Sequence, residues 1–146
     1  MKSLNPVVDA VDYAITILQQ AELIAVASIT SSKVDYRVEV GPHLRHVLEH
    51  FQQLVKGLHL GKVDYDSRER DLSLEQDVAV LRAQIVGLIQ SLRALTHADI
   101  QATIEVLLLG RLDGSVQFSA PSTVLRELLF VTSHATHHYA LLTNLL

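Results

Sequence analysis

Cysteine is absent from this sequence of 146 residues. Its absence excludes a disulfide scaffold, a thiolate zinc site and a cysteine nucleophile. A surplus of positive charge is also absent, because the formal net charge is −4 at pH 7, whereas a nucleic-acid-binding protein normally carries a basic face. The six glycines form neither a G-x-G-x-x-G nor a Walker motif, and the serines lack a nucleophile-elbow context. The sequence therefore argues against nucleic-acid binding, a phosphate-cradling loop and serine-hydrolase chemistry.

Long hydrophobic runs are missing as well. The mean hydropathy is +0.26, but no apolar run approaches the roughly 18 residues that a membrane span needs. Asp9 and Asp12 interrupt the amino-terminal segment, so it does not read as a signal peptide. We expect a cytoplasmic protein that does not contact membranes, with residues 1–146 forming a single domain.

Apolar residues recur at helical spacing in four segments, 7–29, 44–58, 74–95 and 128–145. Gly41-Pro42 precedes the second segment, where proline suits a first helical turn. Ser73 with Gln76 resembles a capping box at the start of the third. Pro121-Ser122 precedes the fourth. Four amphipathic helices of matched length must bury their apolar stripes against one another, which predicts an all-α fold, a four-helix bundle.

Two of the connections are longer than turns. Residues 60–72 form a polar, charge-rich link, long enough to let helix 74–95 lie parallel to helix 44–58 as a crossover. Residues 100–118 alternate apolar and polar side chains around Asp113-Gly114, which predicts a short β-hairpin before the last helix. An extended loop, or a continuation of helix 74–95 to about residue 109, is the alternative for this segment.

Histidine is concentrated in two short windows, and the first to consider lies in helix 128–145. His134 and His138 are four residues apart, so both side chains stand on one face, where an H-x-x-x-H pair can chelate a divalent ion. His138 lies within the apolar stripe and His137 points toward its flank. Two core histidines, each satisfied by a hydrogen bond, are the alternative. The presence of a second cluster favours metal binding.

That second cluster is His43, His46 and His50, near the start of helix 44–58. The apolar periodicity favours His50 and His43 over His46 for an inward position. Periodicity alone does not settle which of them ligates, and at least one is expected to be a surface residue.

The segments V-G-P-H-L-R-H-V-L-E-H-F and S-T-V-L-R-E-L-L-F-V-T-S-H-A-T-H-H-Y carry a resemblance. They resemble the DinB-like family, which includes the YfiT-type metalloenzymes and the bacterial thiol-dependent S-transferases. The resemblance implies a four-helix bundle with a long crossover between its second and third helices, and it implies a homodimer. It also implies that His46, His134 and His138 bind the metal, with His50 as the alternative to His46.

Glu22 falls inside the apolar stripe of helix 7–29, where a lone carboxylate is costly to bury. If this helix lies antiparallel to helix 44–58, Glu22 reaches the level of His46 and His50. It could then orient a ligating imidazole or act as a base. A glutamate that reaches solvent at the helix edge is the alternative, and the commoner arrangement.

Two functions from different classes remain. Three neutral imidazoles leave an open position on zinc or nickel, where a bound thiolate or water becomes a nucleophile. The family resemblance implies a thiol-dependent S-transferase or isomerase acting with a low-molecular-weight thiol on a small-molecule substrate. The alternative is a non-catalytic, stress-related bundle that binds a metal or a small molecule.

Overall fold

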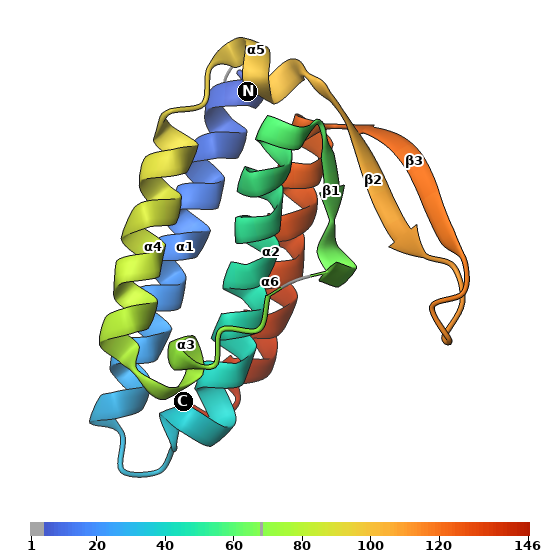
Figure 1. Cartoon of the computed structure of the whole chain (residues 1–146). Helices are drawn as coiled ribbons and strands as arrows, with labels where there is room; N and C mark the ends of the chain where they lie inside the picture. Colours follow the sequence, from blue (N-terminus) through green and yellow to red (C-terminus); the bar gives the residue numbers. More distant parts are fainter. Residues whose placement is uncertain (1–4, 68) are drawn as a thin grey trace.

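The computed structural model describes residues 5–67 and 69–146. Helices dominate this part of the chain, and a small three-stranded sheet accompanies them. Its four long helices lie side by side (Figure 1): α1 (Pro6–Thr30), α2 (Gly41–Leu60), α4 (Val78–Arg93) and α6 (Val124–Thr143). Residues 1–4, which belong to the predicted domain 1–146, lie outside the described residues. The prediction of a mostly helical chain is confirmed.

The long helices pack in a ring. α1 contacts α4 and α6, and α2 contacts the same two helices, so α1 and α2 occupy opposite corners. α2 and α4 run in the same direction, and α1 and α6 run in the other (Figure 1). The core between them is formed by the apolar stripes; among its fully buried side chains are Leu18, Leu44, Leu48, Leu81, Ile85 and Leu128.

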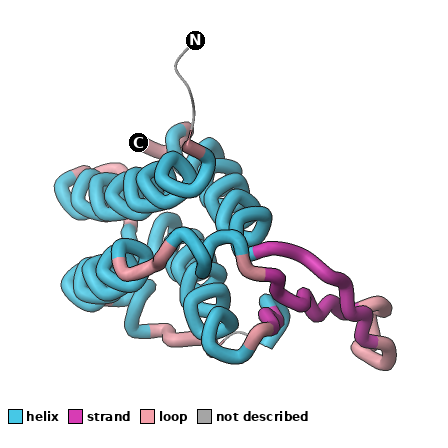
Figure 2. Tube along the Cα trace, turned by 90° about the horizontal axis from the view of Figure 1, so that it is seen from above, coloured by secondary structure: helices cyan, strands magenta, loops and turns pink. Residues whose placement is uncertain are grey.

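The sheet projects from one side of the helices (Figure 2). β2 (Thr103–Leu109) and β3 (Gln117–Thr123) form the antiparallel hairpin predicted from the alternating pattern. Gly114 lies in its turn with φ of 72°, a left-handed conformation that suits glycine. The first strand, β1 (Lys62–Asp64), pairs parallel to β2 and buries Val63. It lies in the 60–72 link, which we expected to be a polar crossover without a strand, and residue 68 of that link lies outside the described residues.

The third predicted helix is divided in two. A short α3 (Ser73–Gln76) ends at Asp77, whose backbone is extended and whose side chain accepts a hydrogen bond from the Ala79 amide to cap α4. The predicted capping box at Ser73 is therefore wrong, because this residue donates its side-chain hydrogen bond to Asp71. A capping box does occur at the start of α5 (His97–Gln101), which also contains the first residue of the predicted alternation, Ile100.

Two short helical turns complete the described elements. η1 (Tyr36–Val40), a π-helical turn, leads directly into α2, and η2 (Tyr65–Ser67), a 3₁₀ turn, follows β1. Gly41 begins α2 against α3, where an added Cβ would lie 2.4 Å from the carbonyl oxygen of Glu75. Only glycine allows so close an approach, which explains why a glycine precedes Pro42.

α1 is long and apolar enough, by length and composition, to cross a membrane. Its most apolar 18-residue window has a mean hydropathy of 1.3, although 44% of that window is buried inside the protein. A core helix of a soluble protein meets the same criterion. The absence of a membrane span therefore remains a prediction, as does the cytoplasmic location.

Candidate metal centre

The seam between α2 and α6 brings together three of the predicted histidines. His46 projects from α2, and His134 and His138 project from adjacent turns of α6. One ring nitrogen from each of them lies within 4.8 Å of the other two, and all three side chains are half-buried. These are the ligands that the family resemblance implies.

The nitrogens of His46 and His134 have the separation that a small divalent ion requires. Nε2 of His134 lies 3.2 Å from Nε2 of His46. Zn–N bonds of 2.0–2.1 Å in tetrahedral geometry separate two ligand nitrogens by about 3.3 Å. The same distance is that of a hydrogen bond between the two rings when one of them carries the proton. An ion that binds here must therefore displace that proton, as expected for histidine ligands.

His43 contacts the third predicted ligand, His138. Its Nδ1 lies 2.8 Å from Nδ1 of His138, so one of these nitrogens donates a hydrogen bond to the other. With Nδ1 of His138 engaged, Nε2 is the nitrogen that it offers to an ion. Ligating histidines commonly use their second nitrogen in this way, which fixes the orientation of the ring. The sequence placed His43 in the cluster without giving it this role.

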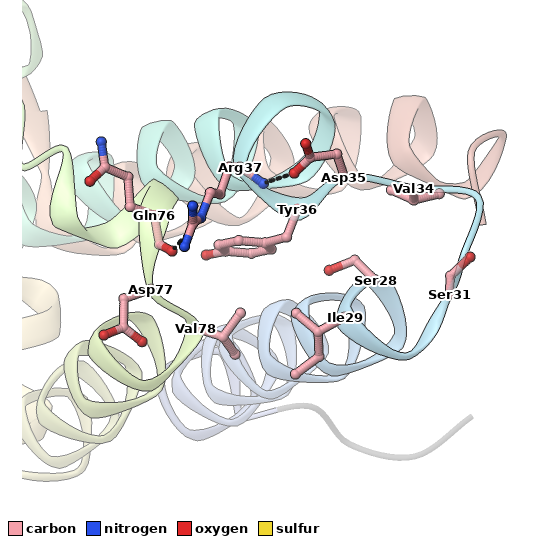
Figure 3. A pocket seen from close by; sticks show the side chains of 10 residues that line it. All are labelled: Ser28, Ile29, Ser31, Val34, Asp35, Tyr36, Arg37, Gln76, Asp77 and Val78. Carbon is pink, nitrogen blue, oxygen red and sulfur yellow. Dashed lines mark hydrogen bonds between the residues drawn. The ribbon is translucent and has the colours of Figure 1, made fainter.

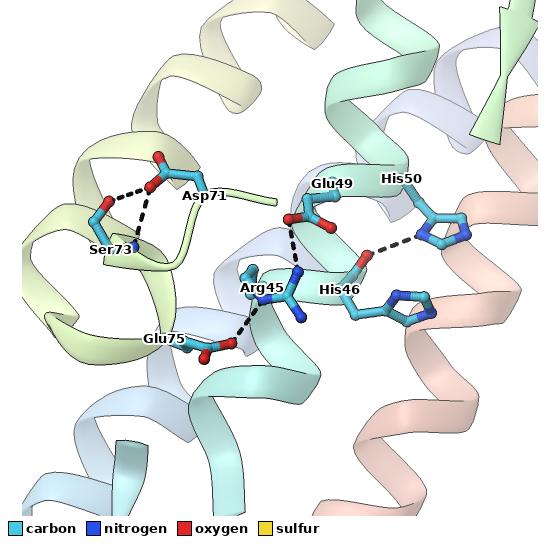
Figure 4. Close-up of polar contacts among 7 residues, drawn as sticks. All are labelled: Arg45, His46, Glu49, His50, Asp71, Ser73 and Glu75. Carbon is cyan, nitrogen blue, oxygen red and sulfur yellow. Dashed lines mark hydrogen bonds and ion pairs between the residues drawn. The ribbon is translucent and has the colours of Figure 1, made fainter. Parts of the chain in front are cut away.

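His50, the alternative to His46, lies one turn further along α2 and is only 6% exposed. Its Nδ1 donates to the backbone carbonyl of His46 at 2.9 Å (Figure 4). Its ring stacks on His134, with centroids 3.9 Å apart and an interplanar angle of 29°. The ring also stacks with Tyr65, with centroids 5.4 Å apart. His50 therefore supports a predicted ligand by ring contact, and it lies outside the group of three.

The electrostatic environment favours a neutral ligand. Burial lowers the pKa of His138, and the nearby rings of His43, His137 and His50 lower it further. Burial acts in this direction because it penalises the charged imidazolium, and a second positive ring would repel the first. Only the neutral imidazole can ligate, so the lowered pKa extends the pH range in which His138 is available.

The opposite flank of α2 is anchored by charge. Arg45 points away from His46 (Figure 4) and joins α2 to α3 through Glu75, with Nε 2.7 Å from Oε2. The same guanidinium pairs with the fully buried Glu49 at 2.9 Å. A charge-assisted pair in a partly buried position fixes the first turns of α2 against α3, and the backbone that carries His46 is held with them.

Glu22 is engaged elsewhere. Both Nε and Nη2 of Arg82 lie 2.9 Å from its Oε1, and Glu22 is 32% exposed at the edge of α1. The reason lies in the helix arrangement: α1 borders α4 and α6, and α2 occupies the opposite corner. The structure thus agrees with an edge glutamate, and it does not support a role for Glu22 in orienting a ligand.

A depression of about 840 Å³ lies between the end of α1, η1 and the α3–α4 junction (Figure 3). Asp35 and Asp77 face it, but each caps the helix that follows it. The hydroxyl of Tyr36 donates to the carbonyl of Leu74 at 2.6 Å, and Arg37 donates to the carbonyl of Gln76. These polar groups stabilise the local turns, so we consider the histidine seam the candidate site.

Sequence reasoning gave no role to Tyr65 and did not single out Glu127 of α6, whose carboxylate accepts the Tyr65 hydroxyl. Tyr65 stacks on His50. It lies in η2 directly after β1, whose pairing with β2 has no local signal in the sequence. Comparison with protein-family models, curated proteins and solved structures finds no match for this chain.

Proposed function

We propose that this chain is a metal-dependent enzyme of the DinB-like type, folded as a four-helix bundle with a long crossover between α2 and α4. The parallel direction of these two helices and the ring of contacts among the four long helices support the fold. The observation that carries the function is the convergence of His46, His134 and His138 within 4.8 Å.

The residues of the chain fit a zinc or nickel ion with an open position. Three imidazoles supply neutral nitrogen ligands, and a fourth position is left to solvent or substrate in sites of this kind. When bound, such an ion lowers the pKa of a thiol or water at that position and so makes it nucleophilic at neutral pH. His43 orients His138, and His50 holds His134 from its ring face.

The reaction that we propose is thiol-dependent S-transfer or isomerisation. The chain has no cysteine, which is consistent with a thiol that comes from a low-molecular-weight co-substrate. The three histidines are half-buried and so remain partly accessible to such a molecule, whereas the neighbouring His50 and Tyr65 are buried.

The test is metal content together with activity, on protein prepared without a histidine tag. We expect about one zinc or nickel ion per chain in the wild type and in His59→Ala, an exposed histidine outside the seam, and loss of the ion in His138→Ala. The metal-loaded wild type should then conjugate small thiols to electrophiles in a screen, and His138→Ala should not.

Wild-type protein that takes up neither zinc nor nickel at pH 7.5, where most imidazoles are neutral, contradicts the metal centre. Protein that binds the ion but turns over no thiol in the screen contradicts the enzyme and fits a non-catalytic metal-binding bundle.

A further inference from the structure

A second cavity, of about 340 Å³, lies between the β2–β3 hairpin and the first turns of α6. Most of its wall is apolar and comes from both elements: Val106, Leu108, Ala120, Pro121 and Phe130. The volume is within the range of small-molecule sites, which are typically apolar with a few polar groups that fix orientation.

Among the polar groups of this cavity, Arg126 supplies the spare hydrogen-bond donors, because the hydroxyls of Tyr65 and Ser122 already donate to Glu127. Glu127 is fully buried, and its carboxylate is already engaged: Oε1 accepts the Tyr65 hydroxyl at 3.0 Å, and Oε2 accepts Ser122 at 2.6 Å. Oε2 also accepts Nη1 of Arg126 at 2.9 Å, which balances the charge. A molecule that enters the cavity therefore meets a carboxylate whose oxygens are already bonded, beside an arginine.

Arg126 stands at the rim. Its side chain is 66% exposed, and its guanidinium carbon lies 5.5 Å from the centroid of the Phe130 ring. A guanidinium carries five N–H donors and no acceptor, in a planar fork that matches a carboxylate. Stacking on Phe130 holds the fork over the apolar wall.

We propose that this cavity binds an apolar monocarboxylate, with the hydrocarbon or aromatic body against Phe130 and the hairpin and the carboxylate on Arg126. Burial of the body supplies affinity, because apolar surface is removed from water on both sides. The guanidinium supplies selection for an anionic oxygen head over a neutral one.

The cavity shares a wall with the histidine seam. Phe130 lies 6.2 Å, centroid to centroid, from the predicted ligand His134, and Tyr65 lies 5.4 Å from His50. The cavity is thus placed to hold the body of a substrate of the metal centre, and this connection to the metal centre rests on the proposed function. Binding itself does not require it.

The test uses two probes of the same shape, 2-naphthoate and the neutral 2-naphthamide, titrated into the full chain and followed by probe fluorescence and by amide chemical shifts. We expect 2-naphthoate to bind with the largest shifts around residues 106, 120 and 130. Arg126→Gln should weaken it about tenfold and leave 2-naphthamide unchanged, as expected for loss of one charge-assisted contact. Arg82→Gln, which removes another exposed arginine of a surface pair, should change neither probe.

Filling the cavity gives an independent test. Ala120→Phe should abolish binding of both probes, with thermal unfolding recorded to establish that the variant is folded. If Ala120→Phe does not fold, the contrast between the two probes in Arg126→Gln still decides. Failure of 2-naphthoate to bind, equal weakening of both probes by Arg126→Gln, or full binding to folded Ala120→Phe would overturn the proposal.

The proposal of a metal centre and the proposal of a carboxylate-binding cavity can be refuted separately. His138→Ala should retain 2-naphthoate binding although it loses the ion, because His138 is not part of the cavity wall. Loss of 2-naphthoate binding in that variant would place the carboxylate on the metal and overturn the cavity proposal while supporting the metal centre.

Discussion

Replacement of His50 by phenylalanine separates support from ligation. His50→Phe keeps a flat ring against His134 and Tyr65 but removes every nitrogen that could bind an ion. It also removes the hydrogen bond to the carbonyl of His46, which contributes about 0.5–1.5 kcal/mol. Because the stack is retained, we expect zinc binding with the wild-type stoichiometry of about one ion and less than about tenfold weaker affinity.

His50→Ala removes the ring as well. Truncation of a buried phenylalanine costs about 3–5 kcal/mol, and for the smaller imidazole, 6% exposed here, we expect about 2–3 kcal/mol. At about 2–4 °C per kcal/mol for a chain of this length, the Tm of the metal-free protein should fall by about 4–12 °C. Loss of the stack on His134 should weaken zinc about 10–100-fold, which is typical for removal of a residue that orients a ligand.

The assay is zinc competition against a chelating dye, with metal analysis of the dialysed protein and thermal unfolding of the metal-free form. His46→Phe is the matched variant on the same helix, and we expect it to lose the ion. If His50→Phe loses the ion and His46→Phe retains it, His50 is the ligand and the reasoning from the ring stack is refuted.

Three further outcomes follow from single contacts. The pKa of His138 is lowered below its unfolded value, so the unfolded chain binds more protons. The free energy of unfolding of the metal-free protein should therefore fall as the pH drops through about 6.5. In urea titrations between about pH 7.5 and 5.5, a His138→Gln variant should show a flatter dependence of this free energy on pH. Tyr65→Phe removes a donor from the buried Glu127 and should lower the free energy of unfolding in urea by about 1–3 kcal/mol, whereas an unchanged value would mean that water replaces the hydroxyl. Gly57→Ala would place a Cβ 2.6 Å from the backbone of β1 and should lower Tm. In Gly87→Ala the added Cβ meets nothing within 4 Å, so this variant should stabilise α4 by about 0.5–1 kcal/mol. Differential scanning calorimetry distinguishes the two variants, and equal shifts of Tm would contradict the packing argument.

The long helices could be predicted because an amphipathic stripe is a local property of the sequence. The hairpin could be predicted for the same reason, from alternation around Asp113-Gly114. β1 could not, because a three-residue strand with one buried side chain, Val63, has no periodicity of its own and depends on its register with β2. The break at Asp77 was also missed, since one residue ends a turn and caps the next helix while the apolar spacing continues past it.

The candidate site divides in the same way. The i, i+4 spacing of His134 and His138 places both imidazole rings on one face of the helix, whatever the tertiary structure. The periodicity on α2 correctly identifies His50 as more buried than His46, but burial alone does not say which histidine faces His134 and His138. The resemblance pointed to His46, which the structure places beside the other two. For Glu22 the structure agrees with the commoner arrangement, a glutamate at the helix edge, because α1 borders α4, where Arg82 pairs with it.

The small sheet contributes to both the histidine seam and the cavity beside it. Pairing of β1 with β2 fixes the turn η2, and η2 sets Tyr65 between His50 and Glu127. Tyr65 thereby closes the inner side of the histidine seam and forms part of the cavity under the hairpin. His134 and His138 come together through local helical spacing, and His46 is predicted from the family resemblance, whereas the position of Tyr65 depends on a non-local strand pairing. Changes in β1 should therefore alter ligand orientation and cavity binding together, without altering any residue that could bind the metal.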